Sequence, residues 1–480
     1  MRISLIVPPR LQSLRAIKAS MPPTPLLYLA AALRAHGHSP SIHDLSLYPE
    51  LAGFNSQELP KTILKLIEKS APEIFAINCF TTLHFQSVVQ IAQTLSNIFP
   101  DIPIILGGAH PSLFPEDILK NCHFVDYVVV GEGEDIMVQL LNVISHKADT
   151  RDLSHIQALA YRAGGKIFYN SRENFIADLD SLSDPAWDLI NISDYYSDHS
   201  EWNNPKKLSF QLAVPILTSR SCPFSCNFCA AHTTMGRQYR MRSPSRVVDE
   251  IQFLHEYSGE NYFSFLDDNV NLNKNHILGI CSEICKRGLN IQFETLSGLH
   301  LGSLDNEVID ALDEAGLVFV RLPLEHGNDL IRNKIIGKRL DRDKIYTVCE
   351  SFKNKPNIRT ASMFIMGFPE DTINTLEDTR KMIIELQLDF NQVSSLLPFP
   401  GTEIFNQASR DGLLLHNYNP DRLWAGETCL DPTESDFFLK PYAMSIDELK
   451  MYRVIFDKLR IPSTSNILVA QSQENTGAGK

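Results

Sequence analysis

Short apolar stretches alternate with amphipathic stretches in two separate series along this chain of 480 residues. The first series runs from residue 1 to about residue 145 and begins with ISLIVPP and PLLYLAAALRAHG. The second series begins near residue 211 with QLAVPILTS. Strands that alternate with helices predict a parallel sheet covered on both faces, so we expect an α/β protein with two such sheets.

The first series contains five strand-like segments, and ligands of such sheets bind at the carboxyl ends of the strands. No G-x-G-x-x-G motif follows the first strand, where Pro8 and Pro9 stand, which disfavours a nicotinamide cofactor. The residues after the later strands are candidate ligand contacts, although turn formation explains them equally well. They are Thr81, Thr82, Gly107, Gly108, Gly131, Glu132, Gly133 and Glu134.

The second series contains six strand-like segments, from QLAVPILTS to FNQVSSLLP, with helical stretches between them. Six β/α units are two short of a closed eight-stranded barrel, so we expect a partial barrel at residues 206–405. Residues 146–205 then form a connector that includes a small hairpin. Residues 406–480 form a C-terminal extension, in which Trp424, Cys429, Phe437 and Phe438 serve either a substrate pocket or the core.

Composition narrows the partners and the cellular compartment. The formal net charge is −13 and no long Lys/Arg run occurs, which argues against a nucleic-acid partner. The N-terminal apolar run is too short for a signal peptide, and no window reaches the roughly 18 apolar residues of a membrane span. We therefore expect a cytoplasmic protein, whose clustered cysteines are metal ligands or catalytic groups and not disulfides.

Three of the nine cysteines, Cys222, Cys226 and Cys229, lie within eight positions after the first strand of the second series. The spacing C-x3-C-x2-C allows three thiolates to converge on one metal centre. A structural zinc site needs a fourth ligand, for which His232 is the nearby candidate. An iron–sulfur cluster held by three cysteines leaves one iron open for another ligand. Incidental cysteines are the third interpretation.

The segment CPFSCNFC resembles the cluster-binding signature of the radical S-adenosylmethionine (SAM) superfamily, including the aromatic Phe228 before the last cysteine. LDDN, MGFPED and PFPGTEIF are similar to segments found at strand ends in this superfamily. The segments TPLLYLAAALRAHGHSPSIHD, ILGGAHPSLFPE and VVVGEGE resemble a cobalamin-binding domain. Together they identify the chain as resembling the cobalamin-dependent radical SAM enzymes over residues 1–405.

This resemblance implies a Rossmann-like cobalamin-binding domain at residues 1–145, followed by a partial (β/α)6 barrel of the TIM type. It implies a [4Fe–4S] cluster on Cys222, Cys226 and Cys229, with SAM on the open iron. Phe228 would then pack by the adenine, while Asp268 and Glu325 would hold polar groups of SAM. An ordinary strand-end salt bridge is the alternative for the two carboxylates.

In the family's methylases, a 5′-deoxyadenosyl radical from SAM removes hydrogen from an unactivated carbon, which then takes a methyl group from methylcobalamin. The resemblance therefore implies a carbon methyltransferase with a small-molecule or peptide substrate and a reductant protein such as flavodoxin or ferredoxin. A non-methylating cyclisation or rearrangement is the alternative within the superfamily. A non-catalytic cobalamin or metal-binding sensor is the alternative from another class.

The sequence departs from the family at several histidines. The D-x-H-x-x-G motif, whose histidine ligates cobalt, is absent from residues 1–145, which leaves the cobalt ligand open. His110 is interpreted as a residue that orders its loop and not as a cobalt ligand. His326 stands in PLEHG where relatives often have a Gly-Ile-Glu-Ser-Gly segment, and His300 stands where an arginine often follows the third strand. Both are either proton-transfer groups or hydrogen-bonded loop residues.

Overall fold

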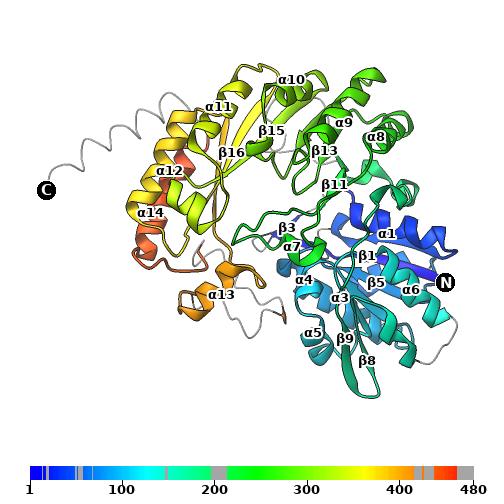
Figure 1. The fold of residues 1–480 in the computed structure, drawn as a ribbon. Coiled ribbons are helices and arrows are strands. Elements are labelled where there is room, and N and C mark those ends of the chain that lie inside the picture. The colour runs from blue at the N-terminus through cyan, green and yellow to red at the C-terminus, as the bar shows by residue number, and fades with distance from the viewer. Residues whose placement is uncertain are drawn as a thin grey trace. The chain divides into compact units, whose positions relative to one another are not determined.

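The chain divides into two compact units in a computed structural model (Figure 1). Unit 1 comprises Met1–His199, Ala231–Gly236 and Asn417–Pro432, and unit 2 comprises the remainder. The structure describes residues 1–12, 15–17, 21–48, 51, 58–67, 69–145, 150–195, 213–415, 424–425 and 437–461. Of the C-terminal residues singled out above, Cys429 lies outside this described part.

Unit 1 is built on a seven-stranded sheet with the order β4-β1-β5-β6-β7-β8-β9. The five strands from β4 to β7 are parallel, and the β8–β9 hairpin joins them in antiparallel fashion. In chain order the parallel strands run 2-1-3-4-5, which is a doubly wound topology. The strands are β1 (Arg2–Val7), β4 (Ser39–Asp44), β5 (Ile74–Asn78), β6 (Ile104–Gly107), β7 (Tyr127–Val129), β8 (Leu159–Ala163) and β9 (Lys166–Asn170), with a separate hairpin of β2 (Arg10–Gln12) and β3 (Arg15–Ile17).

Helices cover both faces of this sheet. Successive strand residues point to opposite faces and are apolar on both, so each face needs to be buried. On one face Leu5 and Ile105 pack in a core with α1 and α6, and on the other face Ile6 and Ile77 pack with α2, α3 and α5. This arrangement confirms the Rossmann-like fold. The helices of unit 1 are α1 (Thr24–Ala35), α2 (Glu58–Ile67), α3 (Phe85–Ile98), α4 (Ala109–Leu113), α5 (Pro115–Asn121), α6 (Glu134–Ser145) and α7 (Ala231–Met235).

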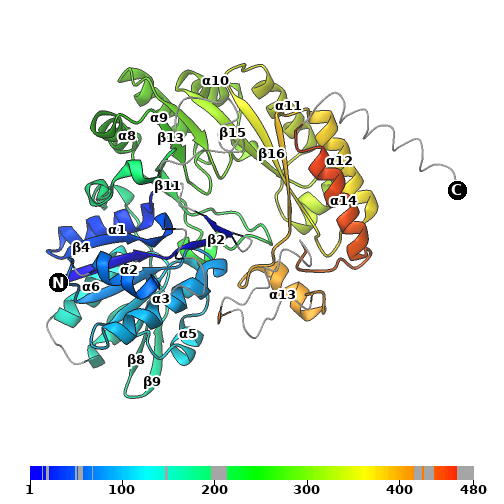
Figure 2. The ribbon, with the colours of Figure 1, turned by 180° about the vertical axis from the view of Figure 1, so that it is seen from behind.

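Unit 2 contains six parallel strands that are hydrogen-bonded in the order of the chain (Figure 2). The first and last strands form the two edges of this sheet, so the expected partial barrel is confirmed. The strands are β10 (Val214–Ile216), β13 (Tyr262–Phe265), β14 (Gln292–Thr295), β15 (Leu317–Glu325), β16 (Arg359–Met366) and β17 (Phe390–Ser395). The short strands β11 (Ser219–Arg220) and β12 (Arg240–Met241) pair separately.

The helices of unit 2 begin and end at residues with clear capping roles. Pro244 opens α8, where its missing N–H costs no hydrogen bond, and Gly259 ends the helix with a φ of 71°. Ser445 and Glu448 form a capping box at the start of α14. The helices are α8 (Pro244–Ser258), α9 (Lys274–Lys286), α10 (Asn306–Glu314), α11 (Arg342–Lys353), α12 (Ile373–Leu386), α13 (Glu403–Arg410) and α14 (Ile446–Lys458).

The domain boundaries expected at residues 145, 205 and 405 stay predictions, and the chain segments do not respect them strictly. The β8–β9 hairpin from the expected connector continues the first sheet. Trp424, from the expected C-terminal extension, belongs to unit 1. Among the described residues, no helix is both long enough and apolar enough to cross a membrane.

Candidate cofactor sites

The cysteine loop, residues 221–230, follows β10 and β11 at the carboxyl edge of the barrel sheet. Its cysteines Cys222, Cys226 and Cys229 form no disulfide and are partly exposed. Ser221, directly before the first cysteine, has a φ of 77°, which is costly for a residue with a side chain. Strained residues of this kind concentrate at functional sites when the surroundings hold them in place.

Two residues of the LDDN segment hold the start of the cysteine loop. The buried Asp267 carboxylate accepts hydrogen bonds from the Thr218 N–H at 3.1 Å, the Thr218 hydroxyl at 2.7 Å and the Ser219 hydroxyl at 2.5 Å. Burial raises the pKa of Asp267 to about 6. The Asn269 amide Nδ2 donates to the Cys222 sulfur at 3.3 Å. Both contacts fix the position of the first cysteine.

A nearly buried ion pair lies beside the thiols. The Lys338 ammonium is 2.7 Å from the Glu325 carboxylate, and the two side chains are 12% and 9% exposed. Burial lowers the pKa of Lys338, but the charges of Glu325 and Cys226 outweigh it, so the pKa is raised overall. Burial raises the pKa of the Cys226 thiol to about 11, and the charge of Lys338 partly opposes that rise. The Lys338 cation therefore favours the thiolate form of Cys226.

The middle of the cysteine loop is anchored through Asn227. Its N–H donates to the Ile336 carbonyl at 3.1 Å, and its carbonyl accepts from the Ile404 N–H at 3.1 Å. Phe228 packs with an apolar cluster that includes Ile336 and Ile404, and its ring centroid lies 6.3 Å from that of Phe368. Phe228 thus lines the base of the loop next to the cysteines.

The neighbouring Asp268 differs from Asp267 because it points to the opposite side of the chain. Asp268 is exposed, yet the protein atoms around its carboxyl raise its pKa. Within the described part of the chain, no hydrogen-bond partner of this carboxylate is found. Of the two adjacent carboxylates after β13, Asp268 is the one exposed to solvent.

The two unusual histidines of the barrel have different surroundings. His326 is fully buried, where its Nε2 donates to the Asp371 carboxylate at 3.0 Å and its Nδ1 accepts from the Asn328 N–H at 3.0 Å. These bonds support the loop interpretation for His326. His300 stacks on Phe224 of the cysteine loop at 4.5 Å, and its Nδ1 bonds with the Ser303 hydroxyl. Burial lowers the pKa of His300 to about 4, so its ring is neutral near pH 7.

In unit 1 the candidate residues Thr81, Thr82, Gly107 and Gly108 meet at the carboxyl edge of β5 and β6. The Thr81 hydroxyl is buried, and it has no hydrogen-bond partner among the described residues. Gly108 has a φ of 104°, and a Cβ there would lie 2.4 Å from the Cys79 carbonyl oxygen. A Cβ at Gly107 would have the Val129 carbonyl oxygen as its nearest neighbour, at 3.8 Å. A side chain is therefore tolerated at Gly107 but not at Gly108.

His110 is buried beside this edge with both ring nitrogens engaged. Its Nε2 donates to the Trp424 carbonyl at 2.9 Å, so its Nδ1 accepts from the Thr82 hydroxyl at 3.1 Å. Phe85 and Phe114 flank the ring, with centroids at 4.1 and 5.1 Å. This geometry leaves no nitrogen for a metal and supports the loop-ordering role expected for His110.

The remaining candidates form the turn between β7 and α6, which the chain itself covers. A Cβ at Gly131 would lie 2.6 Å from the Thr234 oxygen of α7. Arg172 donates to the Val130 carbonyl at 2.6 Å, and the Glu132 carboxylate accepts from the Ile176 N–H at 3.1 Å. Gly133 and the buried Glu134 open α6. These contacts favour a structural role for this turn.

Family models match both halves of the chain. The model described as B12 binding domain matches residues 14–141, and that of the Radical SAM superfamily matches residues 216–383. The chain belongs to the radical SAM enzymes that carry a B12-binding domain. The expected family is confirmed, and cobalamin and SAM are the cofactors of the two matched domains.

Relatives of this radical SAM enzyme include an uncharacterized methyltransferase of Pyrococcus horikoshii, 29% identical over 90% of this chain and 87% of that protein. An anaerobic magnesium-protoporphyrin IX monomethyl ester cyclase of Cereibacter sphaeroides is 27% identical over 87% of this chain and 65% of that protein. The structure of the methyltransferase TsrM from Kitasatospora setae, with cobalamin and a [4Fe–4S] cluster bound, has a TM-score of 0.69 at 18% identity over 85% of this chain and 78% of that one. This last similarity shows a shared fold.

The residues of the radical SAM enzyme fit the cofactors of its two domains. No group of three or more His, Cys, Asp or Glu side chains in the described ranges is arranged to hold a single metal ion. The cysteine loop instead offers three soft thiol donors, which suit an iron–sulfur cluster, and an amide N–H and a nearly buried lysine lie beside them. The buried Thr81 hydroxyl, which has no hydrogen-bond partner among the described residues, suits a ligand at the B12-binding edge.

Sequence reasoning missed three residues of this site. Asp267 and Asn269 flank the predicted Asp268 in the segment after β13, where no strand alternation indicates which side chain turns inward. Lys338 lies thirteen positions after Glu325, and no local pattern marks it. The pairing of Lys338 with Glu325 means that this carboxylate is engaged in the structure.

We predict opposite outcomes for alanine at the two adjacent glycines of the B12-binding edge. Gly108→Ala forces a side chain into a positive φ and against the Cys79 carbonyl, so we expect a loss of stability of at least about 1 kcal/mol. Gly107→Ala meets ordinary contacts and should leave the unfolding free energy nearly unchanged. Urea unfolding of both variants measures this, and equal destabilisation by the two would contradict it. Weaker cobalamin binding by a stable Gly107→Ala would indicate that the ligand approaches there.

We also predict that His110 makes unit 1 sensitive to acid. Burial lowers the pKa of His110 to about 4 in the folded protein. Between pH 6.5 and 4 the His110 ring is therefore protonated in the unfolded chain but not in the folded one. Stability should therefore fall by up to about 3 kcal/mol as the pH falls through this window. Urea unfolding of His110→Gln between pH 7.5 and 4.5 should show a smaller decrease than the wild type. His123→Gln, at an exposed site, is the control, and an equal effect of both variants would contradict the assignment.

Proposed function

We propose that this enzyme is a cobalamin-dependent radical SAM methylase that transfers a methyl group to an unactivated carbon. The observation that carries the proposal is the presence, in one chain, of a B12-binding domain and a radical SAM domain with a three-cysteine loop. The name of the archaeal relative, a methyltransferase similar over 90% of this chain, supports methyl transfer.

We assign the [4Fe–4S] cluster to Cys222, Cys226 and Cys229, which leaves one iron open for SAM. The exposed Asp268 and the pair of Glu325 with Lys338 would bind polar groups of SAM, and Phe228 would pack by its adenine. Cobalamin would lie at the carboxyl edge of the first sheet. Its contacts would be Thr81, Thr82, Gly107 and Gly108, and also Gly131, Glu132, Gly133 and Glu134 if the covered turn opens.

The cluster held by Cys222, Cys226 and Cys229 would supply, with SAM, the radical chemistry that activates the substrate carbon, and cobalamin would supply the methyl group. The chain's residues bind and orient these groups. The methionine end of SAM carries one carboxylate and one ammonium group, which match the charges of Lys338 and Glu325. The Asn269 amide stabilises negative charge on the Cys222 sulfur. Phe228 and Phe368 exclude water from the base of the loop.

We further propose a small-molecule or peptide substrate and a low-potential reductant protein such as flavodoxin or ferredoxin. The net charge of −13 supports the expectation that no nucleic acid is bound. None of the eight cysteines within the described ranges forms a disulfide, which supports a reducing compartment such as the cytoplasm.

A radical cyclisation or rearrangement without methyl transfer is the second candidate. The observation that favours it is the 27% identity with a cyclase over 87% of this chain. A cobalamin or metal sensor without catalysis is the candidate from another class.

Anaerobic reconstitution with iron, sulfide and hydroxocobalamin, followed by reduction in the presence of SAM, separates these functions. The methylase predicts bound corrinoid and formation of 5′-deoxyadenosine together with methionine. Deoxyadenosine without bound corrinoid would overturn the methylase and leave the rearrangement. Bound corrinoid without any cleavage of SAM would leave the sensor. Isotopically labelled SAM then tests candidate substrates, because only a methylase passes the label to product.

A further inference from the structure

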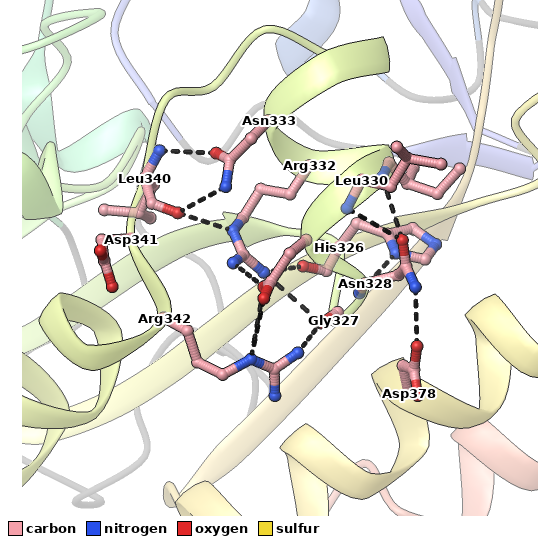
Figure 3. A network of polar contacts seen from close by, with 12 residues as sticks. His326, Gly327, Asn328, Leu330, Arg332, Asn333, Leu340, Asp341, Arg342 and Asp378 are labelled. Carbon is pink, nitrogen blue, oxygen red and sulfur yellow. Dashed lines mark hydrogen bonds and ion pairs between the residues drawn. The ribbon is translucent and has the colours of Figure 1, made fainter.

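A buried arginine, Arg332, stands between Glu325 and Lys338 in the chain. The Arg332 side chain is fully buried, in a short π-helical turn (Ile331–Ile335) that follows β15. Figure 3 shows its guanidinium at the centre of a network of polar contacts. A buried guanidinium is costly unless its donors are hydrogen-bonded, so the position of every acceptor around it is constrained.

Two carbonyl acceptors of Arg332 each follow one member of the ion pair closely in the chain. Its Nη1 donates to the carbonyl of His326, the residue after Glu325, at 2.8 Å. Its Nε donates to the Leu340 carbonyl at 3.0 Å, two residues after Lys338. Its own carbonyl accepts from the Lys338 N–H at 3.0 Å. One residue therefore ties together the two segments that carry the two charges.

Neighbouring residues add further hydrogen bonds to this network around Arg332. Asn333 donates to the Leu340 carbonyl at 3.1 Å and accepts from the Leu340 N–H at 2.7 Å (Figure 3). Asp329 accepts from Nη2 of Arg332 and balances its charge. Arg342 bonds to Asp329 and to the Gly327 carbonyl from the outer side, and it is 38% exposed.

The segment between Glu325 and Lys338 also contacts the cysteine loop. The carbonyl of Ile336, in this segment, accepts a hydrogen bond from the Asn227 N–H at 3.1 Å. Asn227 stands between Cys226 and Cys229 in the chain. Glu325 and Arg339, at the two ends of the segment, both hold positive φ angles, 64° and 54°. Such conformations persist when surrounding contacts over-determine them, and the hydrogen bonds of Arg332 are those contacts.

We propose that Arg332 is a positioning residue, which touches neither SAM nor the cluster but fixes the Glu325–Lys338 pair and the adjoining cysteine loop for SAM binding. This inference rests on the proposed SAM site. It predicts that the arrangement of residues 336–341 depends on the two-armed geometry of the guanidinium and not only on its charge.

Arg332→Lys tests this inference because it keeps the positive charge and removes the planar guanidinium with its several N–H donors. In the protein without added cofactors, we expect amide hydrogen exchange of residues 336–341 to accelerate at least tenfold. In the reconstituted enzyme we expect iron content to be retained, SAM to bind at least tenfold more weakly, and the SAM-induced change in the EPR spectrum of the reduced cluster to be reduced. Arg410→Lys is the matched control, because Arg410 is exposed on α13 and pairs with the adjacent Asp411, and it should change none of these readouts.

Asn333→Ala provides a second variant if Arg332→Lys fails to fold, since it removes two bonds to Leu340 from a half-buried position. Unchanged exchange and unchanged SAM affinity in a folded Arg332→Lys, or in Asn333→Ala when only that variant folds, would overturn the inference. If wild-type enzyme itself binds no SAM, the proposed function fails. The exchange measurement then still decides whether Arg332 fixes the segment.

Discussion

Replacement of Cys222, Cys226 and Cys229 by alanine is expected to abolish the iron–sulfur cluster and, with it, all cleavage of SAM. The other described cysteines of unit 2 lie on helices α9 and α11, where Cys281 and Cys349 are buried and Cys285 is exposed. The first sheet and its two apolar cores do not involve the loop, so the B12-binding domain should still fold. Iron and sulfide analysis, the visible spectrum and 5′-deoxyadenosine formation measure these outcomes.

Cys285→Ala is the matched control, because this cysteine is exposed on α9 and should leave cluster content and SAM cleavage unchanged. A full iron–sulfur spectrum in the triple variant would refute the ligand assignment. Loss of cobalamin binding together with the cluster would show that the two domains do not fold independently, and circular dichroism would reveal that case.

The second large effect is expected at the ion pair. Lys338→Met leaves the Glu325 carboxylate buried without its partner, which should cost about 3–5 kcal/mol of unfolding free energy. The double variant Lys338→Met with Glu325→Gln removes both charges and should recover most of this loss. If the pair binds SAM, the double variant should still bind SAM at least tenfold more weakly than the wild type.

Chemical denaturation and SAM binding, measured on the same preparations, separate these two effects. Lys286→Met, which breaks an exposed pair with Glu283, is the control and should change neither quantity noticeably. Recovery of both stability and SAM affinity in the double variant would mean that the pair is only structural. The strand-end salt bridge considered from the sequence would then be the correct interpretation of Glu325.

The fold and the cysteine loop could be predicted because their signals are local. Alternating apolar segments define the strands, and three cysteines within eight residues define the loop. The role of His110 as a residue that orders its loop was expected from its position beside a strand end, whereas the loop role of His326 was one of two interpretations left open. The histidine partners themselves were not predictable, since the Trp424 carbonyl comes from a segment 314 residues further along the chain.

What the sequence did not reveal depends on tertiary packing. Lys338 reaches Glu325 only because the π-helical turn and Arg332 return the chain to the strand end. The turn at Gly131 has the composition of a ligand loop, but Arg172 and α7 cover it with partners that no local pattern identifies. Asp267 and Asp268 are adjacent and chemically identical, and their different burial decides which one holds the cysteine loop.

The two sheets also differ in when the ribosome can complete them. The barrel strands pair in chain order, so each new β/α unit can add to the one before it as it emerges. Unit 1 instead needs residues 231–236 and the Trp424 carbonyl, which are synthesised long after its own strands. The hydrogen bond from His110 to Trp424 closes a much longer loop of chain than the pairing of successive barrel strands does. Such non-local contacts form late. The B12-binding edge therefore reaches its final form only after most of the radical SAM domain has been made.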